Sequence, residues 1–140
     1  MSKRLFYTTL CIASLLAGGS IYAIFRENSY IGAFASNLFP IEPIKEFLKT
    51  HTNSFFKFYL ADFLWCFSLC LGLFAILVQK YKYATFCVCT AFAFGTAWEV
   101  LQYVGLIRGT GDIFDVITYF LAALTAMILF IIKEKKDEKN

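Results

Sequence analysis

The sequence predicts an all-α, polytopic membrane protein: one domain over residues 1–140 that forms a bundle of four transmembrane helices with both termini in the cytoplasm. Three observations predict this fold class. With 59% hydrophobic residues, 16% charged residues and a mean hydropathy of +0.65, the chain is too apolar for an ordinary soluble domain. Four apolar stretches are each long enough to cross a hydrocarbon core of about 30 Å. The basic residues gather at the ends of these stretches.

The first predicted span covers residues 5–25, an uncharged run that follows Lys3 and Arg4. At about 1.5 Å per residue its 21 residues match the hydrocarbon thickness. The basic start and the small residues at 17–20 also resemble a signal peptide, but the apolar run continues past them, which favours an uncleaved helix. The same small residues allow a neighbouring helix to approach closely.

Residues 26–57 form the longest polar segment and are predicted to be an outer loop. Pro43 suits the first turn of a helix, and Ile44, Phe47 and Leu48 then fall on one face with charged residues opposite. This pattern predicts a short amphipathic helix, about residues 44–48, lying on the membrane surface.

The remaining spans are predicted at about residues 58–78, 84–106 and 113–132. The N-terminus, the short connection after the second span and the C-terminal tail hold eight basic residues, against five in the outer loop and the turn after the third span. The positive-inside rule therefore places both termini in the cytoplasm. No basic patch is interleaved with exposed aromatic residues, so the expected partner is the lipid bilayer and not nucleic acid; the sequence leaves the oligomeric state open.

All five cysteines fall inside apolar runs, where a cysteine packs as a small hydrophobic residue: Cys11, Cys66, Cys70, Cys87 and Cys89. We expect free thiols and no disulfide framework. Their spacing differs from that of common zinc sites, so neither a metal nor a cofactor is predicted.

Six polar residues share one predicted depth near the outer ends of the last three spans: Asp62, Glu99, Gln102, Arg108, Asp112 and Asp115. Glu99 and Gln102 lie three residues apart and share a helical face, as do Asp112 and Asp115. Glu99 lies about 10 Å of helix below the end of its span, where a carboxylate costs on the order of 2.5–3.5 kcal/mol unless it faces a partner inside the bundle. We expect Arg108 to be that partner.

Several of these residues also have a purely structural interpretation. Asp112 can cap the fourth helix, Asp115 can complete a capping-box arrangement, and Arg108 can meet headgroup phosphates. Capping does not explain Glu99, so the Glu99 and Gln102 pair favours a functional site. Tyr103 and Tyr119 are predicted to be core aromatics that hydrogen-bond to the acids.

These residues resemble the pattern of the VanZ-like family of small bacterial membrane proteins: Glu99-x-x-Gln102, then Arg108, then Asp112-x-x-Asp115 before an apolar helix, with Asp62 near the start of the second span. The family pattern continues with an Asn and a Gly where this chain has Tyr119 and Ala122, which indicates a divergent branch. The resemblance implies a multi-pass protein of the bacterial cell membrane, and the name member is associated with low-level resistance to the glycopeptide teicoplanin.

Three functions remain open. The first is a non-enzymatic protein whose outward acidic pocket binds an amphiphile, such as a lipid-linked envelope component or a lipopeptide-like antibiotic. The second is an intramembrane enzyme that uses the carboxylates as acid and base, or as magnesium ligands, on a lipid headgroup. The third is a structural or accessory subunit. The sequence has no Ser–His dyad, no HExxH motif and no Gly-rich phosphate loop, which favours a non-enzymatic role. No catalytic residue is predicted.

Overall fold

The computed structural model describes residues 2–25, 42–77, 81–107 and 109–138, and this part of the chain contains helices and turns but no strand. The helices are α1 (Lys3–Phe25), α3 (Glu42–His51), α4 (Ser54–Leu77), α5 (Tyr81–Tyr103) and α6 (Ile113–Asp137). Four of them, α1, α4, α5 and α6, are long and apolar enough to cross a membrane. The predicted all-α class is confirmed, with four helices able to span a membrane, and the cytoplasmic position of both termini stays a prediction.

Two helix boundaries differ from the prediction. The third span ends at Tyr103 and not near Leu106, because Gly105 takes a φ of +74° and the Leu106 N–H turns back to the Leu101 carbonyl at 2.9 Å. The fourth helix continues past residue 132 into the charged tail, where ion pairs support it. The short helix predicted near residues 44–48 is confirmed as part of α3, and its position on the membrane surface stays a prediction.

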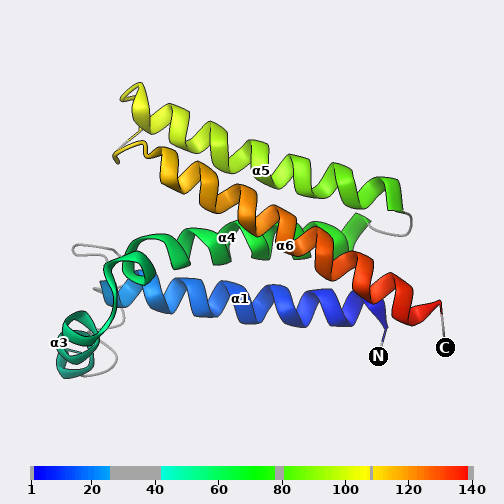
Figure 1. The fold of residues 1–140 in the computed structure, drawn as a ribbon, viewed down its shortest axis with the longest axis horizontal. Coiled ribbons are helices and arrows are strands. Elements are labelled where there is room, and N and C mark those ends of the chain that lie inside the picture. The colour runs from blue at the N-terminus through cyan, green and yellow to red at the C-terminus, as the bar shows by residue number, and fades with distance from the viewer. Residues whose placement is uncertain (1, 26–41, 78–80, 108, 139–140) are drawn as a thin grey trace.

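Helix α4 contacts all three other long helices, and α5 packs antiparallel beside α6 (Figure 1). Helix α3 lies at the end of the bundle where α1 ends and α4 begins. Helices α1 and α4 approach closely at Gly18, where an added Cβ would lie 3.2 Å from Leu64 Cβ. This contact confirms the predicted packing role for Gly18, whereas a Cβ at Gly19 would meet no atom within 4 Å.

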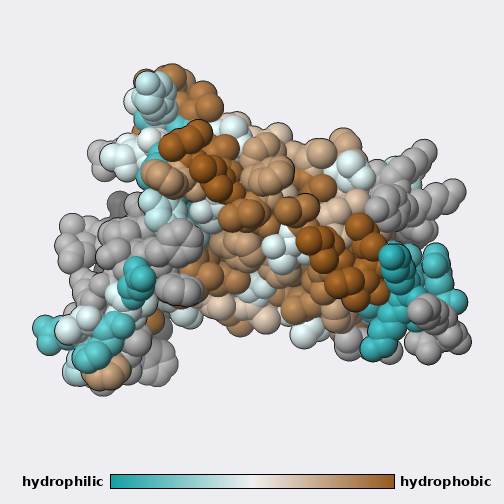
Figure 2. All heavy atoms as spheres, viewed as in Figure 1, coloured by the Kyte–Doolittle hydropathy of each residue, from teal (hydrophilic) through white to brown (hydrophobic). Residues whose placement is uncertain are grey.

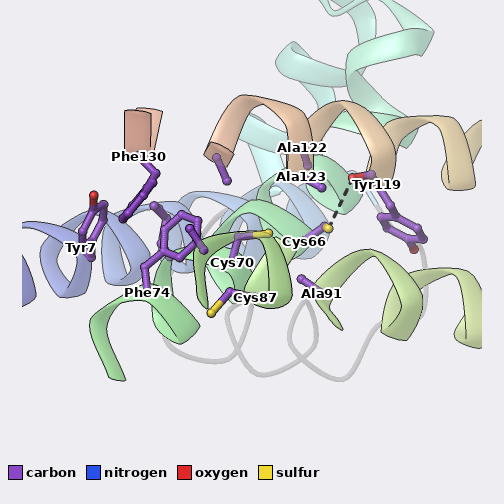
Figure 3. Packing of buried hydrophobic residues seen from close by; sticks show 13 residues of the cluster. Tyr7, Cys66, Cys70, Phe74, Cys87, Ala91, Tyr119, Ala122, Ala123 and Phe130 are labelled. Atoms are coloured by element: carbon purple, nitrogen blue, oxygen red, sulfur yellow. Dashed lines mark hydrogen bonds between the residues drawn. The ribbon is translucent and has the colours of Figure 1, made fainter. Parts of the chain in front are cut away.

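The surface and the core both suit a bilayer. Figure 2 shows hydrophobic side chains over the middle of the visible face and hydrophilic ones toward the two ends. In the core, the Phe74 ring lies 5.4 Å from Tyr7 and 5.3 Å from Phe130 between ring centroids, next to small side chains of α5 and α6 (Figure 3). The five cysteines are free thiols, as predicted, and three of them are buried in this core.

Candidate functional site

Glu99 is the buried acid of the outer half of the bundle. Its side chain is only 5% exposed, and described residues of α6 and the preceding turn satisfy both carboxylate oxygens. The Tyr119 hydroxyl donates to Oε1 at 3.0 Å, and the Asp112 backbone N–H donates to Oε2 at 3.1 Å. Both donors are electrically neutral, so these two hydrogen bonds leave the charge of a carboxylate uncancelled.

Asp112 joins the end of the turn to α6. It is the N-cap residue of that helix, and its side chain accepts from the Phe114 N–H at 2.9 Å, as predicted. In a capping box the acceptor for the N-cap amide comes from three residues further on, which would be Asp115. Here the Asp112 N–H donates to Glu99, so an acid of the neighbouring helix takes the role considered for Asp115.

Tyr119 is held in place from two sides. Its ring lies against Gly95 of α5, where an added Cβ would be 2.7 Å from Tyr119 Cδ2. On the other side, the Cys66 thiol of α4 donates to the Tyr119 carbonyl oxygen at 3.6 Å (Figure 3). Tyr119 stands where the VanZ-like pattern has Asn, so in this chain a phenol supplies the hydrogen bond to the buried acid.

The turn between α5 and α6 packs directly on the last turn of α5. An added Cβ on Gly111 would lie 2.6 Å from the Glu99 carbonyl oxygen, and one on Gly109 would lie 2.5 Å from Gln102 Nε2. Gly109 also has a φ of +142°, which side-chain-bearing residues rarely adopt. The half-buried Gln102 side chain therefore lies against the turn, three residues from Glu99.

Helix α4 adds two residues to the same region. Asp62 is half-buried and lies, like Glu99 and Asp115, in the neighbourhood of Tyr119. Tyr59 lies near Asp112, and its ring lies 6.1 Å from that of Phe114 between centroids. Tyr59 is not among the six polar residues that the sequence singled out. Its spacing of three residues from Asp62, on the same helical face, is the signal that points to it.

The remaining predicted residues have different outcomes. Tyr119 is a buried partner of an acid, as predicted, whereas Tyr103 is 82% exposed, so its prediction as a core aromatic is wrong. Arg108 lies outside the described residues, and its pairing with Glu99 stays a prediction. Within the described ranges, no three His, Cys, Asp or Glu side chains are grouped so that they could hold a metal ion.

The comparison with protein families gives one result. The model of the VanZ/LLP1 family matches residues 5–134, which include α4, α5, nearly all of α1 and α6, and the six polar residues named above. No curated protein and no solved structure matches the chain. With its four membrane-spanning helices and this match over nearly its whole length, the chain belongs to the VanZ/LLP1 family.

Proposed function

We propose that this protein is a non-enzymatic protein of the bacterial cell membrane that binds the cationic head of an amphiphile in the outer leaflet. The ligand is a lipid-linked envelope component or a lipopeptide-like antibiotic. Asp62, Glu99, Asp112 and Asp115 supply negative charge, and Gln102 supplies hydrogen bonds. The sequence adds Arg108 as the residue that orients these acids.

The buried position of Glu99 carries this proposal. A carboxylate inside a membrane is costly and marks a functional site more often than a packing contact. Glu99 is held by neutral donors, and Asp62, Asp112 and Asp115 bring further acids from α4 and α6 to the same region. A cationic head placed among these acids offsets their mutual repulsion in a low dielectric.

The charge distribution supports the orientation that we propose. Eight of the thirteen basic residues fall on the side assigned to the cytoplasm. Lys3 at the start of α1 and Glu134 near the end of α6 form an ion pair, so the two ends of the chain lie at the same end of the bundle, which supports a common side for both. The Glu99 region then lies in the half of the bundle that is nearer the outer leaflet.

The first experiment compares carboxylate-to-amide variants at matched sites. Glu99→Gln and Asp115→Asn change the proposed site, and Glu46→Gln makes the same chemical change on the exposed α3. Membrane abundance and the thermal midpoint are measured beside the sensitivity of the host to envelope-targeting amphiphiles and glycopeptides. We expect site variants that stay abundant but alter sensitivity, and a Glu46→Gln variant that behaves as the parent.

A binding measurement tests the charge of the ligand. The thermal midpoint is recorded with dodecylammonium and with dodecyl maltoside, which have the same chain length but a cationic and a neutral head. We expect dodecylammonium alone to raise the midpoint of the parent, and less so that of Glu99→Gln. The proposal would be refuted if both compounds changed the thermal midpoint of the parent equally. It would also be refuted if dodecylammonium raised the midpoints of both site variants as much as that of the parent.

A scaffold role is the second candidate, and one observation favours it. Both Glu99 oxygens are already satisfied within the chain, as a carboxylate that locks helix packing requires. The Gln amide group would face one of the two donors, so a scaffold predicts that Glu99→Gln is lost from the membrane. Loss of Glu99→Gln and Asp115→Asn from the membrane, with normal Glu46→Gln, would place the scaffold role first.

A further inference from the structure

The turn that closes over Glu99 has an apolar surface. Tyr103 at the end of α5 is 82% exposed, and Val104 and Leu106 in the turn are 56% and 73% exposed. Ile113 and Phe114 at the start of α6 are more than half exposed as well. Exposed apolar side chains gathered at one turn indicate contact with a membrane or with another protein.

The turn is tightly folded and does not bury these side chains. The Leu106 and Ile107 N–H groups both donate to the Leu101 carbonyl, at 2.9 and 3.3 Å, and Gly105 has a positive φ. An added Cβ on Gly105 would meet no atom within 4 Å. The backbone geometry therefore directs the apolar side chains away from the bundle.

The length of α6 places this turn at the membrane boundary. Lys133 is the first charged residue near the C-terminal end of α6, and Ile113 lies twenty residues before it. At about 1.5 Å per residue this distance is about 30 Å, the thickness of the hydrocarbon core. The turn that precedes Ile113 therefore lies at the outer edge of that core.

The apolar patch is also continuous with the surface that faces lipid along the two helices. Trp98 and Leu101 on α5 and Ile117 on α6 are exposed within the candidate spans. In a membrane-spanning bundle, exposed apolar side chains at these positions face the lipid chains. We therefore expect lipid to contact the exposed side chains of the adjoining turn as well.

We propose that the α5–α6 turn lies at the headgroup level of the leaflet away from the charged C-terminal tail, with the side chains of Tyr103, Val104 and Leu106 in contact with lipid. The Glu99–Tyr119 pair then lies beneath the lipid headgroups and not at an aqueous surface. This inference concerns the lipid contact of the turn and does not depend on the amphiphile proposed above.

The test places a single tryptophan in the turn. Leu106→Trp is made in a chain in which Trp65 and Trp98 are replaced by Phe, and the protein is reconstituted in phosphatidylcholine vesicles. Acyl-brominated phosphatidylcholine reports contact with lipid, and iodide reports contact with water. Glu138→Trp, at the exposed end of α6, is the matched aqueous control in the same background.

We expect Leu106→Trp to emit at shorter wavelength than Glu138→Trp, and to be quenched at least twofold more by the brominated lipid and at least twofold less by iodide. Val104→Trp repeats the measurement at a second exposed position, so the result does not rest on one variant. Iodide quenching of both turn variants as strong as that of Glu138→Trp would place the turn in water and overturn the inference.

Discussion

The two ends of the helix bundle hold their charged residues in opposite ways. One end of the bundle is formed by the first residues of α1 and the last residues of α6. There Lys3 Nζ lies 2.7 Å from Glu134 and 3.9 Å from Asp137, and Lys133 also pairs with Asp137. The Lys3 side chain is 45% exposed. At the other end, Glu99 is 5% exposed and accepts hydrogen bonds from a phenol and a backbone amide.

This difference shows where the shape of the protein is strongly determined. Exposed ion pairs contribute little, tolerate movement and are screened by salt. A buried acid that relies on neutral donors needs those donors at fixed positions, because an unmade hydrogen bond in a low dielectric is costly. Gly95 and Gly111 provide that precision, since each allows a close contact that a Cβ would prevent.

The largest loss of folding stability is expected from Gly111→Ala. The new Cβ would meet the Glu99 carbonyl oxygen at 2.6 Å and the Tyr103 N at 2.8 Å, and backbone atoms cannot move aside cheaply. We expect a loss of about 3 kcal/mol, the upper part of the range for overpacking. Thermal unfolding in detergent micelles measures it, with Gly105→Ala as the control, because that site has open space and only an unfavourable φ. A smaller loss in Gly111→Ala than in Gly105→Ala would contradict this account of the turn.

The second-largest loss of folding stability is expected from Gly95→Ala. Its Cβ would lie 2.7 Å from the Tyr119 ring, which must shift and draw its hydroxyl away from Glu99. We expect a net loss of about 1–2 kcal/mol, even though alanine is about 0.8–1 kcal/mol better than glycine within a helix. Gly72→Ala, whose Cβ would make an ordinary 3.4 Å contact with Cys11, should keep that helical gain. Equal thermal midpoints for the two variants would show that Tyr119 is not fixed by Gly95.

Two tyrosines allow a direct comparison of the ends. Tyr119→Phe removes a hydroxyl that donates to Glu99, and we expect a loss of about 0.6–1.7 kcal/mol. Tyr7→Phe removes a buried hydroxyl that has no hydrogen-bond partner among the described residues, so its thermal midpoint should stay unchanged or rise. A double-mutant cycle of Tyr119→Phe with Glu99→Gln measures the coupling, and additive effects would exclude a specific hydrogen bond.

The smallest effect is expected from Lys3→Met, which removes the positive charge and keeps an unbranched side chain. Because the Lys3–Glu134 pair is half-exposed, we expect a loss below about 1 kcal/mol at low salt. At 1 M NaCl, where the Debye length is about 3 Å, the difference from the parent should vanish. The effect of Tyr119→Phe should persist in the same salt series, and a loss of both effects together would remove the contrast between the ends.

The sequence was sufficient for the class of protein and for the spans. Hydropathy and length determine a transmembrane helix almost independently of its neighbours, and the four predicted spans agree with the structure to within a few residues, apart from the α6 extension. Local chemistry also identified Asp112 as an N-cap and Glu99 as an acid that capping does not explain. These features depend on residues close together in the chain.

The tertiary structure decided which groups meet. Each of Tyr103 and Tyr119 lies four residues after an acid, so spacing alone predicted the same role for both. Helix α5 ends at Tyr103, which is exposed, whereas the rotation of α6 places Tyr119 against Gly95 and Glu99. The capping acceptor at Asp112 likewise comes from α5 and not from the next turn of α6. Such partners depend on the relative rotation and depth of two packed helices, and these are set by side-chain contacts along the whole length of both helices.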